Sequence, residues 1–129
     1  MCLAGMLWVV PSVTFAKESS NTPAPVVTIY MIGDSTMSIK DLKDYPEMGW
    51  GVPFATFFDD RVRVDNRAKN GRSTRTFLEE GRWKAVMAEL KKGDYVFIQF
   101  GHNDESVKKK DRYTTPNEYK SNLARFILD

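Results

Sequence analysis

The sequence predicts one α/β domain built on a parallel sheet, and two observations carry this prediction. First, two apolar runs, VVTIYMI at 26–32 and YVFIQF at 95–100, each end at a glycine, which is typical of strands buried on both faces. Second, strand and helix patterns alternate along the chain with short connections, and this order favours right-handed crossovers and helices flanking the sheet. A chain of 129 residues has room for one such domain.

The composition agrees with a globular fold. Hydrophobic residues make up 42 % and charged residues 28 % of the chain, while 19 Lys and Arg against 17 Asp and Glu leave a net charge of +2. These values exclude a disordered or membrane-spanning chain. The one dense basic run, Lys108 to Lys110, is followed at once by Asp111, so we expect no nucleic-acid partner.

The first residues resemble an export signal. The apolar run 2–10 is too short to span a bilayer, and the segment 14–16 (TFA) ends in the small residue that a signal peptidase reads. We therefore predict a signal peptide at 1–16, a flexible N-terminal segment at 17–25 and a secreted or periplasmic product. Because no Lys or Arg precedes the run, a misassigned start codon or a buried N-terminal strand is the alternative. Cys2, the single cysteine, would leave with the signal.

The elements of the domain follow from the pattern. The first strand is 26–32, a helix follows Pro53, and 61–65 (RVRVD) alternates as an edge strand does. Thr76 and Glu79 have the spacing of a capping box at the head of the next helix, in which Gly81 breaks or kinks the chain. We expect that helix to end at Gly93. The strand 95–100, with both faces covered, and a helix from Pro116 to Leu128 complete the order.

Polar loops stand directly after all three predicted strands, where parallel sheets bind their ligands. They are GDSTM at 33–37, NRAKNGRS at 66–73 and GHND at 101–104. Ser35 offers a hydroxyl nucleophile, while Gly71 and Asn103 offer an unobstructed N–H and a side-chain amide. Acyl transfer needs one nucleophile and two or three donors for the oxyanion. Taken singly, each of these residues is more typical of an ordinary turn than of a catalytic site, and it is their joint order that indicates acyl transfer.

These three loops, in this order, resemble the first three blocks of the SGNH or GDSL-type hydrolases. The longer strings GDSTM, NRAKNGRSTRTF, EEGRW and KKGDYVFIQFGHNDE are similar to the rhamnogalacturonan acetylesterase branch. The resemblance covers 26–129 and implies a flavodoxin-like, three-layer fold that deacetylates a carbohydrate ester without a cofactor or metal. It implies that Ser35 is the nucleophile, and that its N–H, the N–H of Gly71 and the amide of Asn103 form the oxyanion hole.

One family element has no counterpart in the sequence. The Asp-x-x-His of the family, which supplies the catalytic base, is absent, and the resemblance does not make His102 the base. We therefore expect a fold incomplete at the C-terminus, with a strand edge at 95–100 that lacks a partner, and a fragment that is inactive or nearly so. For His102 we expect a structural hydrogen bond.

Other side chains leave open alternatives. Asp34 and Asp104 are interpreted as anchors that bond neighbouring backbone. Trp50 and Trp83 are candidates for stacking on sugars or for the core. Arg72 and Arg75 face either an acidic polymer or solvent; the oligomeric state and the substrate-binding residues stay open.

Two other functions compete with the acetylesterase that acts on an acetylated plant cell-wall polysaccharide such as rhamnogalacturonan. One is a flavodoxin-like binder of phosphate or a flavin phosphate at residues 34–37, which the negative charge of Asp34 opposes. The other is a carbohydrate-binding remnant without catalytic activity.

Overall fold

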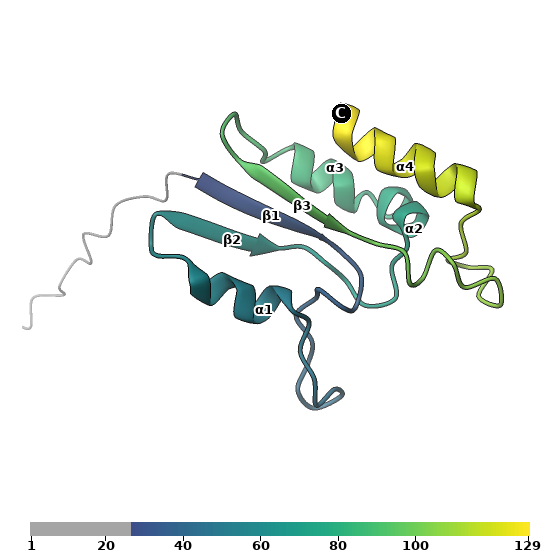
Figure 1. Ribbon diagram of the computed structural model, residues 1–129, viewed down its shortest axis with the longest axis horizontal. Coiled ribbons are helices and arrows are strands. Elements are labelled where there is room, and N and C mark those ends of the chain that lie inside the picture. The colour runs from purple at the N-terminus through teal and green to yellow at the C-terminus, as the bar shows by residue number, and fades with distance from the viewer. Residues whose placement is uncertain (1–26) are drawn as a thin grey trace, which may run out of the picture.

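A three-stranded parallel sheet organises the chain, whose computed structural model describes residues 27–129. The strands are β1 (Val27–Gly33), β2 (Val62–Asn66) and β3 (Tyr95–Gln99), and their order is β2-β1-β3 (Figure 1). Both β2 and β3 pair with β1 in parallel. The predicted parallel α/β fold is thus confirmed, whereas the predicted signal peptide at 1–16 and the segment 17–25 lie outside the described residues.

Helices cover the two faces of this sheet unequally. One face carries the short helix α1 (Gly51–Phe54) and the 3₁₀ turn η1 (Ala55–Phe57). The opposite face carries α2 (Thr74–Glu79), α3 (Arg82–Met87) and α4 (Pro116–Leu128) (Figure 1). The result is the predicted three-layer arrangement.

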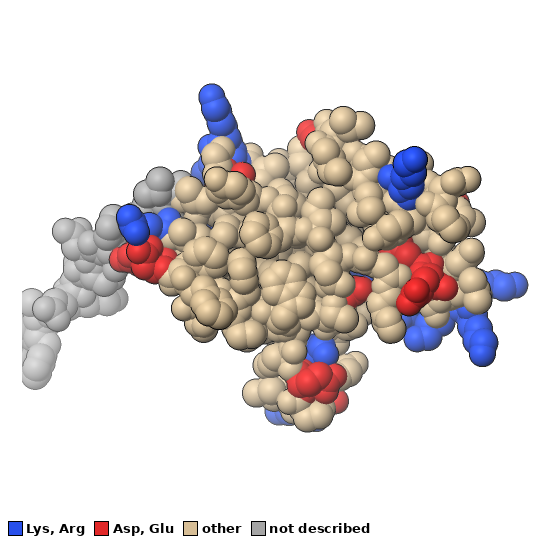
Figure 2. Space-filling view, viewed as in Figure 1, with Lys and Arg blue, Asp and Glu red and all other residues tan. Residues whose placement is uncertain are grey.

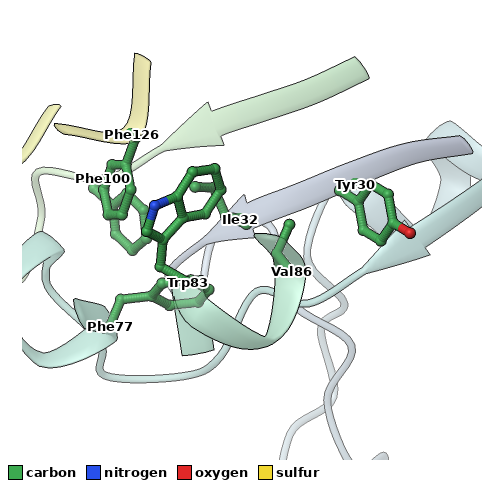
Figure 3. Close-up of a cluster of buried hydrophobic side chains, with 7 residues drawn as sticks. All are labelled: Tyr30, Ile32, Phe77, Trp83, Val86, Phe100 and Phe126. Atoms are coloured by element: carbon green, nitrogen blue, oxygen red, sulfur yellow. The ribbon is translucent and has the colours of Figure 1, made fainter. Parts of the chain in front are cut away.

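The alternation of side chains along β1 divides the core in two. Tyr30 and Ile32 point to the side of α2, α3 and α4, which we call the aromatic face. Ile29 and Met31 point to the other side, the α1 face. Figure 3 shows the buried cluster of the aromatic face, which consists of Tyr30, Ile32, Phe77, Trp83, Val86, Phe100 and Phe126.

Strand β3 differs from its prediction. Both of its faces were expected to be covered, but Tyr95 is 58 % exposed and Phe97 37 %. Both side chains lie on the α1 face, where Phe97 meets Phe54 at a ring-centroid distance of 5.3 Å. α1 has only 4 residues and η1 only 3. These elements are too short to cover this edge strand. Among residues 27–129, β3 pairs with β1 alone.

Capping decides where the helices begin. The predicted box of Thr76 and Glu79 is wrong, because Ser73 is the N-cap and forms the reciprocal pair of hydrogen bonds with Thr76. α2 therefore begins at Thr74 and ends at Glu79, and Gly81, with a φ of +70°, separates α2 from α3 at the position where a break was predicted. α3 ends at Met87, so Gly93 turns the chain into β3 instead of ending the helix. The predicted helix at 116–128 is confirmed.

Candidate active site

The turn after β1 is held by the buried side chain of Asp34. Its Oδ1 accepts hydrogen bonds from the N–H of Thr36 (2.9 Å) and from the hydroxyl of Thr36 (2.8 Å). Its backbone carbonyl also accepts from the N–H of Ser38 at 3.1 Å. Asp34 is thus a turn anchor, as predicted, and Ser35 follows it as a partly exposed residue. Its second oxygen, Oδ2, is buried without a partner in the described part of the chain.

Gly33 brings the start of this turn close to β3. A Cβ atom at Gly33 would lie 2.5 Å from the backbone oxygen of Gln99, closer than any real contact of that kind. The absence of a side chain therefore lets β1 and β3 keep their spacing where the polar turn begins. Any larger residue would displace the backbone that carries Ser35.

The loop after β2 brings Gly71 to the same edge of the sheet. The N–H of Lys69 donates to the carbonyl of Gly33 (3.0 Å), and Ser38 donates to the side chain of Asn70. Gly71 has a φ of +75°, which favours glycine. A Cβ atom there would lie 2.9 Å from Nη1 of Arg112. The loop is therefore bonded to the Ser35 turn, and a guanidinium lies close to Gly71.

The loop after β3 is tied to α2. Asn103 is 6 % exposed, and its Nδ2 donates one hydrogen bond, to the carbonyl of Arg72 at 3.0 Å. Asp104, 3 % exposed, accepts from both the N–H and the hydroxyl of Thr74. Thr74 in turn accepts from Nδ2 of Asn122 on α4 (3.0 Å). The prediction that Asp104 bonds neighbouring backbone is wrong, because its partner is the start of a helix 30 residues away.

The three predicted residues meet in one pocket. A cavity of about 660 Å³ is lined by Ser35, Gly71 and Asn103 together. Within residues 27–129 the backbone N–H groups of Ser35 and Gly71 donate to no protein acceptor, and the amide of Asn103 keeps a second hydrogen. A hydroxyl and three donors with free hydrogens thus belong to residues that line one pocket.

His102 lines the same pocket but is not held there. Its side chain is 74 % exposed, and its Nδ1 lies 3.8 Å from a carboxylate oxygen of Glu105, too far for a hydrogen bond. It makes no hydrogen bond to another described residue, so the predicted structural bond is not found. The next residue, Asn103, is buried and points inward, and the two adjacent side chains therefore diverge.

The two candidate arginines are occupied by internal partners. Arg72 forms an ion pair with Glu80 at 2.9 Å, and its hydrogen bonds hold the pKa of that carboxyl below the ordinary value. Arg75 donates to the carbonyl of Lys110 at 2.9 Å and to that of Tyr113 at 3.2 Å. Both arginines are thus held by protein partners, and that they face an acidic polymer stays a prediction.

The two tryptophans differ. Trp83 is buried, and its Nε1 donates to Asp129 at 3.0 Å, so it is a core residue. Trp50 is 40 % exposed and packs edge-on against Phe54. Neither of them lines the pocket that contains Ser35.

A search of the described residues finds no metal or membrane feature. No group of three or more His, Cys, Asp or Glu side chains between 27 and 129 is placed to hold a metal ion. Over the same residues, none of the helices is both long enough and apolar enough to span a membrane.

Several residues close to the site belong to no motif from which the sequence could have predicted their position. Asn122 and Arg112 reach the strand ends from α4 and from the connection before it. Ser38, which is fully buried, donates to the side chain of Asn70 in the loop after β2. Arg112 stands two residues after the basic run Lys108 to Lys110 and is not part of any motif.

Comparison with known proteins finds esterases among the relatives of this chain. No family model matches the chain. It is 40 % identical over 93 residues to the rhamnogalacturonan acetylesterase RhgT of Bacillus subtilis, a match that covers 72 % of this chain and 40 % of that protein. It is 41 % identical over 93 residues to the rhamnogalacturonan acetylesterase of Emericella nidulans, covering 72 % and 35 %.

A solved structure shows the same fold. The crystal structure of YxiM from Bacillus subtilis superposes with a TM-score of 0.69 at 32 % identity, covering 81 % of this chain and 29 % of YxiM. The chain thus has the SGNH hydrolase fold over the part that it covers. Its curated homologues are rhamnogalacturonan acetylesterases, so the predicted resemblance to that branch is confirmed. The chain spans about 40 % of the length of RhgT.

Proposed function

We propose that the full-length protein is a secreted or periplasmic carbohydrate esterase that removes acetyl groups from a plant cell-wall polysaccharide such as rhamnogalacturonan. The observation that carries this proposal is the meeting of Ser35, Gly71 and Asn103 in one pocket at the carboxyl ends of the strands. The relatives named as rhamnogalacturonan acetylesterases support the choice of substrate.

Each of the three residues has a role in the proposed reaction. The hydroxyl oxygen of Ser35 attacks the acetyl carbonyl and gives its proton to the general base. The tetrahedral intermediate then collapses to an acetyl-enzyme as the bond to the sugar oxygen breaks and that oxygen takes the proton and leaves as an alcohol. The N–H groups of Ser35 and Gly71 and the amide of Asn103 hold the negative charge of that intermediate. Water then attacks the acetyl-enzyme and releases acetate.

The general base is not assigned to a residue of this chain. A serine hydroxyl is a weak nucleophile without an adjacent base, and the single histidine, His102, is exposed and turned toward Glu105. We therefore propose that residues 1–129 alone release little acetate, and we assign the activity to the full-length protein.

The test is acetate release from acetylated rhamnogalacturonan by the full-length protein and by its Ser35→Ala variant. Loss of the nucleophile is expected to lower kcat by about 10⁴-fold or more. Ser121→Ala, on an exposed position of α4, is the matched control and should keep the rate. Equal rates for Ser35→Ala and the unchanged protein would remove Ser35 from the role.

The same samples distinguish the alternatives. Glycan binding without any acetate release by the unchanged protein would favour a carbohydrate-binding protein. A bound flavin, visible as a yellow purified protein, would favour the flavodoxin-like alternative. Asp34 places a carboxylate in the turn that would have to wrap the phosphate, which opposes this second outcome.

A further inference from the structure

A segment of the chain projects from the body of the molecule close behind the Ser35 turn. We call residues 39–48 the arm; Figure 2 shows it as a lobe below the body, where Figure 1 draws the chain between β1 and α1. The two ends of the arm meet, because the N–H of Gly49 donates to the carbonyl of Ser38 at 3.0 Å. A Cβ atom at Gly49 would overlap the backbone of Ser38. The arm therefore leaves and rejoins the body at one closed neck.

The arm has a defined internal structure. Lys40, whose side chain is 9 % exposed, is paired with Glu47 at 3.0 Å. The N–H of Tyr45 donates to the carbonyl of Asp41 at 3.0 Å, which closes a turn. The ammonium of Lys40 lies over the ring of Tyr45, with Nζ 5.6 Å from the ring centroid. Both the backbone and the ring of Tyr45 are thus held in place before a ligand binds, which lowers the entropic cost of binding.

The free part of Tyr45 belongs to the pocket that contains Ser35. Tyr45 lines this cavity together with Ser35 and is 42 % exposed. Lys40 occupies one face of the ring. An aromatic ring that is supported on one face and exposed in a pocket is a surface on which an apolar face of a ligand packs.

The pocket is larger than an acetyl group requires. Its volume is about 660 Å³, whereas cavities of about 300–1,000 Å³ bind ligands of drug size. Ile39 and Tyr45 give the arm side of the lining an apolar surface, and Asp44 beside them offers carboxylate oxygens that accept hydrogen bonds. A sugar ring needs both features, because it presents C–H groups on its faces and hydroxyl groups at its rim.

We propose that Tyr45 is a specificity residue on which a sugar ring of the substrate packs while the acetyl group lies at Ser35. The proposal rests on the proposed esterase function and adds the residue that recognises the carbohydrate part of the ester. Packing removes water from the aromatic ring and from the C–H face of the sugar. The contact is remote from the reacting bond, so a small acetyl ester without a sugar does not make it.

The experiment compares an ester that contains a sugar chain with one that does not. The value of kcat/KM is measured with acetylated rhamnogalacturonan oligosaccharides and with p-nitrophenyl acetate, for the full-length protein and for its Tyr45→Ala variant. The ratio of the first kcat/KM to the second should fall by about 3- to 10-fold in Tyr45→Ala. The fall should come from a higher KM for the oligosaccharide. An unchanged ratio would overturn the proposal.

Further variants separate the ring of Tyr45 from the rest of the arm. Tyr45→Phe keeps the ring and should keep the ratio. Leu42→Ala is the matched control, since Leu42 is 66 % exposed on the same arm but does not line the pocket. A fall in the ratio for Leu42→Ala as large as that for Tyr45→Ala would overturn the assignment to Tyr45.

The neck allows the whole arm to be removed. When two glycines replace residues 39–48, the hydrogen bond from Gly49 to Ser38 closes a four-residue β-turn, so the body keeps its connection. This variant should lower the ratio at least as much as Tyr45→Ala does. A variant without the arm that keeps the ratio of the unchanged protein would contradict a sugar contact at Tyr45.

Binding without turnover separates this proposal from the proposed function. Calorimetry with deacetylated oligosaccharides measures the contact with the sugar even if no ester is cleaved. Weaker binding by Tyr45→Ala, found in a protein that releases no acetate, would support the sugar contact and reject the esterase. Acetate release by a protein that binds the oligosaccharide equally well with and without the Tyr45 ring would do the reverse.

Discussion

The two faces of the sheet differ in how many side chains they bury. The aromatic face buries a cluster of seven residues under three helices. The α1 face buries four, and Phe57 at the end of η1 is 81 % exposed. The loop with Asn103 and Asp104 is anchored to α2, on the aromatic side. Stability and the geometry of the site therefore depend mainly on the same half of the molecule.

The largest effect is expected from Phe77 on the aromatic face. Its ring is fully buried and packs against Phe100 and Phe126 at centroid distances of 5.3 and 6.3 Å. Phe77→Ala should lower the free energy of unfolding by about 3–5 kcal/mol, because it removes a buried ring and leaves a cavity. Urea unfolding of the full-length protein measures this, and a loss below about 1 kcal/mol would show that the face is not the main core.

A smaller effect is expected from Phe54 on the α1 face. It is half-buried and contacts Phe58 and Phe97 at centroid distances of 5.1 and 5.3 Å. Phe54→Ala should lower the free energy of unfolding by about 1–2 kcal/mol in the same assay. Phe57→Ala, at the exposed neighbouring position, serves as the control and should stay within about 0.5 kcal/mol. A loss at Phe54 as large as at Phe77 would remove the difference between the faces.

The smallest effect on the free energy of unfolding is expected from the ion pairs of Asp65, Arg67 and Glu89, which we call the polar border of the aromatic face. Asp65 binds Arg67 at 2.6 Å and Arg63 at 2.7 Å, and Arg67 also reaches Glu89 beyond the end of α3 at 2.9 Å. The hydrogen bond from Arg67 lowers the pKa of Asp65 below its ordinary value. A lowered pKa in the folded state means that this stability is present above the unfolded-state pKa and is lost as pH falls through the folded one.

Asp65→Asn should therefore flatten the acid dependence of unfolding. Between pH 5 and pH 3, the free energy of unfolding of the unchanged protein should fall by less than about 1 kcal/mol more than that of Asp65→Asn, because the ion pair is partly exposed. Asp59→Asn, at an exposed pair with Arg61 before β2, should alter the dependence less. Denaturant unfolding at several pH values provides the measurement, and identical slopes for all three proteins would contradict the role of this border.

The fold was largely predictable because its main signals are local. The runs at 26–32 and 95–100 and Pro116 at the start of the last helix are signals that act over a few residues, and the strands and α4 appear where expected. The cover of β3 was not predictable, because a run such as YVFIQF looks the same whether a long helix or a single turn lies above it. The start of α2 could not be predicted because Ser73 and Thr76 are both residue types that cap helices, and the structure shows Ser73 in that position.

The site was predictable as three loops, but not as a network. Ser35, Gly71 and Asn103 could be found because each follows a strand, and parallel strands end at one edge. The partners of Asp104 and the approach of Arg112 to Gly71 join residues far apart in the sequence. Such contacts depend on how the β3–α4 connection folds back, for which the sequence contains no periodic signal.

The buried carboxylate of Asp104 gives this protein a built-in reporter. The amide proton of Thr74 is bonded to that carboxylate, and the Thr74 hydroxyl joins it to Asn122 on α4. Deuterium can reach this amide only when the β3–α4 connection lifts away from α2. Its exchange rate, followed by mass spectrometry or NMR, would therefore report how often the β3–α4 connection opens, in the absence of any substrate.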